Sequence, residues 1–238
     1  MRLPGAIALE GPTYRIKISV DEFNTDLNEV INSMKSILLM MFDLIIDYFG
    51  SGDKHKLEEI LRLDDDLDRL HFLGIRTIKR TAFRDPSQAI DSSIVIKSLE
   101  HIGDTLDRAS NTLIKIAGDT ILSKDICKSI FKDIFSKVSS YISKAVNALT
   151  SQNLALSMKV LIGREELAKE IMSSATPCLD APGVLGLVHE AIVAVYEAAE
   201  IAEVATNRVL LSIGKTEPVV VPKPETAEEF HEESVETQ

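Results

Sequence analysis

The sequence predicts an all-α fold made of two tandem three-helix bundles. Two observations support this fold class: long segments place apolar residues at helical spacing, and the order of these segments repeats once along the chain. The composition is a third observation. Apolar residues make up 45% of the 238 residues, but few of them are aromatic, since the chain has eight Phe, four Tyr and no Trp. We therefore expect Leu, Ile, Val, Ala and Met to fill the core, a mixture that favours helices.

Residues 1–22 differ from the rest of the chain and are predicted to form a short N-terminal extended arm. The stretch "TYRIKISV" alternates apolar and polar positions, which is the period of a strand. A lone strand is unstable, so it must pack on the body, pair with a second chain or remain loose. The preceding "MRLPGAIALEGP" has too short an apolar part for a signal peptide and is broken by two prolines.

Residues 23–119 are predicted to form the first three-helix bundle. Its helices are expected over residues 24–50, 53–83 and 86–118. Asp53 suits an N-cap, Pro86 suits the first turn of a helix, and Gly118 suits a stop. Helices of roughly 25 to 30 residues would be about 40 Å long at about 1.5 Å per residue. Such lengths suit a bundle.

Residues 120–214 are predicted to form the second bundle, with helices over residues 123–150, 151–175 and 182–214. A shift of 100 residues places "FGSGDKHKLEEILRLDDDLDRL" over "LTSQNLALSMKVLIGREELAKE". A shift of 99 residues places "LEHIGD" over "AAEIAE". These matches indicate a tandem repeat.

Residues 215–238 contain three prolines and seven glutamates, which predicts a disordered acidic tail.

The charge and the apolar runs exclude several classes of function. A net charge of −11 disfavours direct nucleic-acid binding and favours a cation as partner. The most apolar run, "SILLMMFDLIIDYF", contains Asp43 and Asp47 and falls short of the roughly 18 apolar residues of a membrane span. We expect a soluble cytoplasmic protein without membrane insertion. Cys127 and Cys178 stand alone and are interpreted as reduced packing residues.

Two pairs of acids interrupt otherwise apolar helix faces. Asp64 and Asp68 are four residues apart, and so are Glu100 and Asp104, so each pair lies on one face of its helix. Consecutive helices of a bundle usually pack side by side, which would bring the pairs together. Four carboxylates in a partly buried place cost several kcal/mol per ion unless a cation lies among them. The pattern therefore predicts a metal site, with a solvated helix edge as the alternative; Gly103 would admit close approach of the helices.

Other polar residues on these helices receive plainer interpretations. His71 follows Asp68 by three residues and could add a nitrogen ligand, but we interpret it as a polar residue at the bundle edge. Asp43 and Asp47 in the first helix are expected to be solvated.

The segment "SLEHIGDTLDRA" resembles the "LERIGD" signature of the PhoU family of phosphate-uptake regulators. The segment "LRLDDDLDRLHFLGIRTIKR" resembles the acidic helix that precedes this signature in archaeal-type members, and the resemblance extends over residues 24–213. It implies two tandem three-helix bundles and bound metal, iron or zinc, with magnesium as a further candidate. The implied ligands are Asp64, Asp68, Glu100 and Asp104. His101 stands where the family usually has Arg.

The second repeat departs from this ligand pattern. The positions that match the four acids are, in order, Arg164, Ala168, Ala199 and Glu203. Because one acid of four remains, we expect an intact metal patch on the first bundle and a lapsed one on the second. An alternative set of acids in the second repeat consists of Glu165, Glu197 and Glu200.

The resemblance implies a non-enzymatic adaptor that modulates a phosphate ABC transporter or phosphate signalling, and family members are often homodimers. A carboxylate-bridged di-metal enzyme is the first alternative, but such bundles use E-x-x-H motifs and this chain offers only one D-x-x-H. A fragment of a DNA-binding transcriptional regulator is the second. The roughly 20 residues before the first bundle are too few for a DNA-binding domain of the size that archaeal relatives carry.

Overall fold

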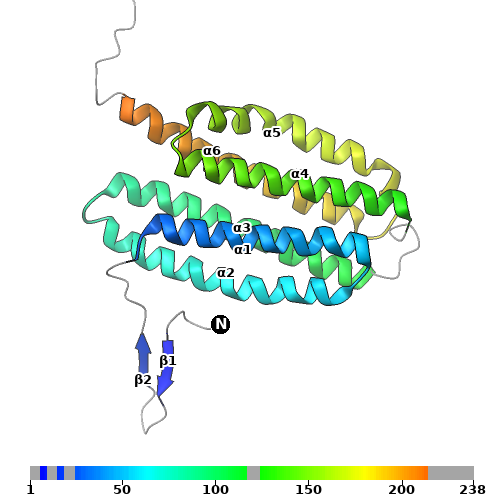
Figure 1. The fold of residues 1–238 in the computed structure, drawn as a ribbon, viewed down its shortest axis with the longest axis horizontal. Helices are drawn as coiled ribbons and strands as arrows, with labels where there is room; N and C mark the ends of the chain where they lie inside the picture. The colour runs from blue at the N-terminus through cyan, green and yellow to red at the C-terminus, as the bar shows by residue number, and fades with distance from the viewer. Residues whose placement is uncertain (1–5, 10–14, 19–24, 117–123, 214–238) are drawn as a thin grey trace, which may run out of the picture.

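The computed structural model describes residues 6–9, 15–18, 25–116 and 124–213. The helices are α1 (Leu27–Ser51), α2 (Lys54–Thr81), α3 (Pro86–Ile116), α4 (Asp125–Thr150), α5 (Leu154–Ala175), the 3-10 turn η1 (Thr176–Cys178) and α6 (Val184–Ile213). The predicted all-α fold of two tandem three-helix bundles is confirmed (Figure 1). The predicted acidic tail over residues 215–238 lies outside the described residues.

The N-terminal strands β1 (Ala6–Leu9) and β2 (Arg15–Ile18) form an antiparallel pair, in which Ala6 lies opposite Ile18. The strand predicted from "TYRIKISV" is therefore present over Arg15–Ile18. Its partner comes from the same chain, only a few residues upstream, which the sequence did not lead us to expect.

Helix ends follow local sequence signals. The side chain of Asp26 caps α1 by accepting a hydrogen bond from the Asn28 N–H at 2.9 Å. Asp53, expected as a cap, accepts from the His55 N–H at 3.0 Å at the start of α2. Gly52 ends α1 with a φ of 73°, a left-handed conformation that glycine adopts without steric cost. These caps set the short turn that makes α1 and α2 adjacent antiparallel helices.

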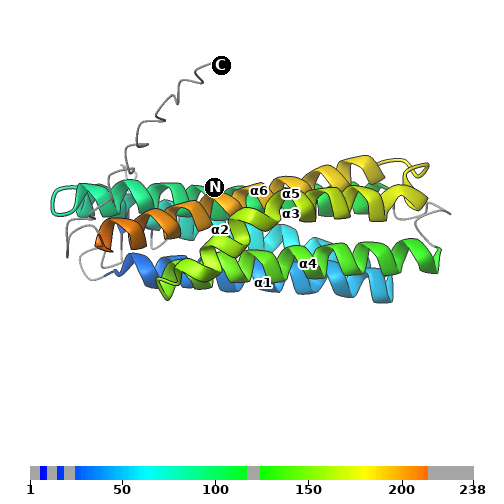
Figure 2. The same ribbon diagram turned by 90° about the horizontal axis from the view of Figure 1, so that it is seen from above.

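The two bundles pack along their whole length. Within each bundle the three helices contact one another, and between bundles α1 packs on α4 and α3 packs on α6. Figures 1 and 2 show the six helices lying nearly parallel to the long axis, with α1 to α3 forming one layer and α4 to α6 the other. None of the described helices has the length and apolar content that crossing a bilayer requires.

An aromatic cluster joins the two layers at the contact of α1 with α4. The ring of Phe49 stacks on that of Phe131 with 5.5 Å between centroids, and Phe42 lies 6.4 Å from Phe135. All four side chains are buried. Burial of each such ring contributes about 1.5–3 kcal/mol through the hydrophobic effect, so the bundles form one continuous core.

The interpretation of the cysteines as reduced residues is wrong. Cys127 near the start of α4 and Cys178 in η1 form a disulfide, with their Cα atoms 5.9 Å apart. Both are fully buried. The turn η1 folds back against the start of α4 and brings together two positions that are 51 residues apart, a proximity that the spacing of two isolated cysteines does not reveal.

Candidate metal centre

Helices α2 and α3 approach closely around Gly103, which is buried. A Cβ atom at this position would overlap with Cδ2 of Leu67 and lie 3.4 Å from Oδ1 of Asp64. The glycine thus lets the acidic face of α2 lie directly against the acidic face of α3, as the sequence predicted. Local sequence builds the two faces, because residues four apart share one side of each helix.

The structure places the four predicted acids in one half-buried patch. Burial and the neighbouring charges of Asp107, Asp68, Asp104 and Glu100 raise the pKa of Asp64 from 3.8 to about 7. Burial also raises the pKa of Asp68, and the charges of Glu100 and Asp104 add to this shift. These carboxylates therefore repel one another, as expected for anions that share a poorly hydrated place.

Two basic side chains neutralise part of this charge. The Lys97 ammonium lies 2.6 Å from Oε2 of Glu100, one helical turn away on α3. The Arg108 guanidinium lies 3.7 Å from Oδ2 of Asp104 and 3.0 Å from Oε2 of Glu190 on α6. Both cations lie beside α3 acids, and the charge that acts on Asp64 remains dominated by carboxylates.

His71 belongs to the patch rather than to an exposed bundle edge. Its Nδ1 lies 3.9 Å from Oε1 of Glu100, and the two side chains are 15% and 16% exposed. Burial lowers the pKa of His71, which favours the neutral ring that can donate a lone pair to a metal. His101 has a different role, because its ring contacts Glu197 on α6 at 3.1 Å.

Asp107 is a fifth acid that the sequence reasoning missed. Its pKa is raised by burial, and its Oδ2 accepts a hydrogen bond from Asn111 at 3.1 Å. The signal was available, since Asp107 follows Asp104 by three residues and Glu100 by seven and thus continues the same helical stripe. Lys97 lies three residues before Glu100 and was likewise missed.

The chemistry of this patch suits a metal ion, although the side chains do not form a finished cage. Carboxylate oxygens and a neutral imidazole are the donors that iron and zinc accept in proteins. Within the described ranges, no three His, Cys, Asp or Glu side chains lie close enough together to hold one ion as they stand. The fit is therefore one of donor type and excess negative charge.

The corresponding place on the second bundle is built differently. Ala168 and Ala199 are buried and bring no oxygen ligands. The guanidinium of Arg164 lies 5.8 Å from the centre of the Tyr196 ring, and the Tyr196 hydroxyl donates to Glu165 at 3.1 Å.

The alternative set of acids on the second bundle has separate partners. Glu165 accepts from Tyr196, and Glu197 contacts His101 of α3. Glu200 is exposed. The structure does not bring these three carboxylates together.

Fold and site together define an all-α protein of two tandem three-helix bundles with an acidic patch on the first. Residues 31–113 match the PhoU domain. The crystal structure of PhoU from Pseudomonas aeruginosa is similar, with a TM-score of 0.62 and 17% sequence identity over 81% of this chain and 96% of that chain. A search of curated proteins found no match. The chain thus has the fold of PhoU and a segment that matches the PhoU domain, and the resemblance predicted from the sequence is confirmed.

Proposed function

We propose that this protein is a PhoU-like regulator of phosphate uptake, a metal-binding adaptor that acts without catalysis of its own. The PhoU domain spans residues 31–113, and all four acids of the patch lie inside it. The observation that carries the proposal is the gathering of these carboxylates in a half-buried place, where burial and the charges of the neighbouring acids raise the pKa of Asp64 to about 7. A cation at this place would relieve the repulsion that the fold otherwise has to tolerate.

The proposed ligands are Asp64, Asp68, Glu100 and Asp104, with His71 and Asp107 next to them. The bound ion would be a divalent or trivalent transition metal, iron or zinc. Oxygen donors beside one imidazole suit these metals better than they suit metals that prefer sulfur ligands. The ion would supply positive charge and coordination positions that accept oxygen ligands. Lys97 and Arg108 would hold Glu100 and Asp104 in place through their ion pairs.

The proposed partners are components of a phosphate ABC transporter and a signalling protein, contacted in the cytoplasm. The half-buried patch lies at the surface of α2 and α3, where a carboxylate or phosphate group of a partner could reach it. A homodimer is the proposed assembly, and light scattering on the purified chain would measure it.

Elemental analysis of protein purified without a polyhistidine tag tests the metal site. We expect the wild type to retain a transition metal and the variant Asp68→Ala with Glu100→Ala to lose it. A matched control is Asp43→Ala with Asp47→Ala, which removes two exposed acids at the same spacing on α1. The control should keep its metal. Equal and near-zero metal in wild type and patch variant would refute the site.

A binding measurement tests the adaptor role. The full chain should bind the ATPase component of a phosphate transporter, and the Asp68→Ala with Glu100→Ala variant should bind it at least about tenfold more weakly, since each tenfold change corresponds to about 1.4 kcal/mol. The α1 control should bind like the wild type. Absence of binding by the metal-loaded wild type would contradict the adaptor proposal while leaving the metal site intact.

A further inference from the structure

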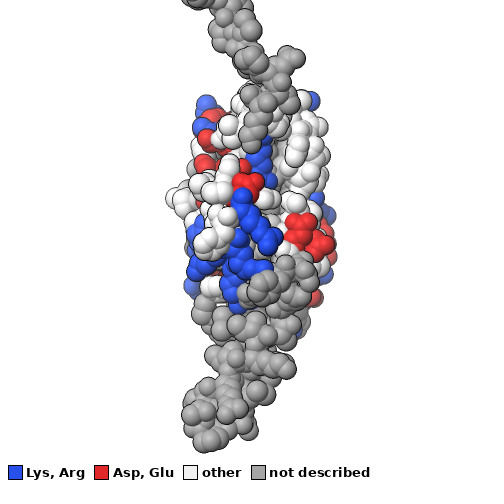
Figure 3. All heavy atoms as spheres, turned by 90° about the vertical axis from the view of Figure 1, so that its left-hand side faces the viewer, with Lys and Arg blue, Asp and Glu red and all other residues white. Residues whose placement is uncertain are grey.

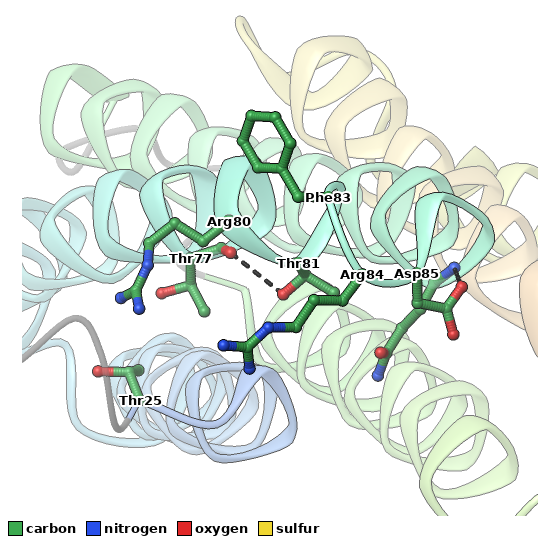
Figure 4. Close-up of a pocket in the computed structure, with 8 residues that line it drawn as sticks. Thr25, Thr77, Arg80, Thr81, Phe83, Arg84 and Asp85 are labelled. Atoms are coloured by element: carbon green, nitrogen blue, oxygen red, sulfur yellow. Dashed lines mark hydrogen bonds between the residues drawn. The ribbon is translucent and has the colours of Figure 1, made fainter.

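The cations of the first bundle lie in separate places. One group gathers at the end of the molecule where α2 turns into α3 (Figure 3), and Figure 4 shows Arg80 and Arg84 at this turn beside Thr77 and Thr81. Arg80 follows Asp68 by twelve residues, or about 18 Å along a helix, so solvent ions screen this group from the acidic patch. The patch therefore depends on nearer side chains for its counter-charge.

Arg108 contacts Asp104 of the patch, but its closer partner lies on the second bundle. The Nε of Arg108 donates to Oε2 of Glu190 on α6 at 3.0 Å, whereas its Nη1 lies 3.7 Å from Oδ2 of Asp104. A charge-assisted hydrogen bond between such groups is about 2.7–2.9 Å long. The guanidinium is thus hydrogen-bonded to Glu190 and only close to Asp104.

The register of α3 against α6 places Glu190 opposite Arg108. The Glu190 side chain is 15% exposed, whereas that of Arg108 is 50% exposed. Seven residues further along α6, Glu197 contacts His101 of α3 at 3.1 Å. The same seven-residue spacing separates His101 from Arg108, and residues seven apart share one face of a helix. The two helices therefore present matching pairs of acids and bases, which fix the position of Glu190.

This arrangement leaves the carboxylate of Asp104 available as a ligand. Among the described residues, no side chain donates a hydrogen bond to it, since the contact with Arg108 at 3.7 Å is too long. A carboxylate that accepts two hydrogen bonds from a guanidinium has its lone pairs engaged and its charge neutralised, so it binds a metal ion less well. Without Glu190, a shift of the Arg108 guanidinium by about 1 Å would form this bond.

We infer that Glu190 is a positioning residue of the proposed metal site. It holds the guanidinium of Arg108 away from Asp104 and keeps this carboxylate open to the ion. The inference rests on the proposed metal-binding function, because it concerns the same site. The second bundle, which has alanine at two of the corresponding ligand positions, would thus contribute to the site of the first.

Titration of the full chain with zinc, followed by calorimetry after a chelator has removed bound metal, tests the inference. We expect Glu190→Gln to weaken zinc binding by about tenfold, the lower end of the loss for residues that orient metal ligands. Arg108→Gln alone should stay within about threefold of the wild type, because it removes the support of Asp104 and the competing charge together. In the Arg108→Gln background, Glu190→Gln should change the affinity less than about twofold, since no guanidinium remains to be released.

The matched control is Glu200→Gln, which removes the same charge from an exposed position on α6. It should weaken zinc binding less than about twofold, the size expected for a screened surface charge. Circular dichroism would verify that every variant keeps its helices. Equal losses in Glu190→Gln and Glu200→Gln would overturn the inference in favour of general electrostatic attraction.

The remaining outcomes separate this inference from the metal site itself. Equal effects of Glu190→Gln with and without Arg108 would overturn the inference, and so would a loss of more than about tenfold in Arg108→Gln alone. An unchanged zinc affinity in Glu190→Gln would overturn it while leaving the metal site intact. No zinc binding by the wild type would refute the metal site and the inference with it.

Discussion

The first and second bundles share one plan of three helices but differ at the positions that would hold a metal. On the first bundle four acids gather between α2 and α3, and the pKa of Asp64 is raised to about 7. On the second, buried Ala168 and Ala199 replace two of these acids, and Arg164 lies over Tyr196. A repeat can therefore keep its fold after losing a site, since apolar packing maintains the fold and a few polar positions make the site.

The bundles also differ in how they are reinforced. The second bundle carries the Cys127–Cys178 disulfide, which ties η1 to the start of α4. The first has neither cysteine, and its α2 and α3 approach closely at Gly103, where the second repeat has Ala202. Removing the disulfide and the close approach at Gly103 one at a time tests whether the acidic patch of the first bundle depends on either of them.

The largest expected effect on stability concerns the aromatic contact that joins the two bundles. Phe131→Ala removes a buried ring that stacks on Phe49 across the contact of α1 with α4. We expect it to lower the free energy of unfolding by about 3–5 kcal/mol, the usual cost of truncating a buried Phe. Denaturant unfolding would measure this. Phe83→Ala, at a side chain that is 93% exposed, is the control and should change stability very little. Equal small effects would mean that the two layers do not form one core.

The disulfide is a cross-link within the second bundle. Replacing Cys127 and Cys178 by Ala opens a cross-link between residues 51 apart and should cost about 2–4 kcal/mol, because the unfolded chain regains conformational entropy. Thermal unfolding of the variant and of reduced wild type would measure the loss. The metal content should stay the same, since the disulfide joins α4 to η1 whereas the acidic patch lies on α2 and α3. Loss of metal in this variant would show that the bundles are coupled at the site.

Close approach at Gly103 should be specific to the first bundle. Gly103→Val places a branched side chain against buried Leu67 and should cost about 2–3 kcal/mol through overpacking. It should also lower metal retention, because α2 and α3 must move apart. Gly186→Val on α6 is the control, since a Cβ there meets no atom within 4 Å. Equal stability of the two variants would contradict tight packing at Gly103.

The pH dependence of stability should also reflect the acidic patch, which only the first bundle carries. The pKa of Asp64 is raised from 3.8 to about 7 in the folded state, so the folded metal-free protein binds the proton more tightly than the unfolded chain does. Its contribution is therefore favourable below pH 4 and is lost as the pH rises toward 7. Asp64→Asn should remove this slope and gain about 1–2 kcal/mol at pH 8 after allowance for solvent screening. An unchanged slope would exclude Asp64 as its source.

Much of the fold was predictable from local patterns in the sequence. The apolar periodicity, the cap at Asp53 and the helix start at Pro86 specified the helices, and the repeat specified two bundles. The pairing of β2 with β1 and the disulfide were not predictable, because both depend on contacts between segments. "AIAL" carries no alternating pattern, and Cys127 and Cys178 are 51 residues apart.

The site was predictable in part. The two acid pairs at four-residue spacing led to Asp64, Asp68, Glu100 and Asp104 together with their meeting across Gly103. The partners that modify their charge were missed. Lys97, Arg108 and the deeper position of His71 depend on side-chain conformations and on the neighbouring helix α6, which a single-helix pattern does not contain.

The most direct test is the pKa of the Asp64 carboxyl group, measured by carbon-13 NMR on protein freed of metal and again after addition of zinc. We expect an apparent pKa near 7 without metal, reflecting burial and four neighbouring carboxylates, and a value well below this with zinc bound. An ordinary pKa near 3.8 in the metal-free protein would contradict the crowding of these acids. An elevated pKa that zinc leaves unchanged would contradict the metal site.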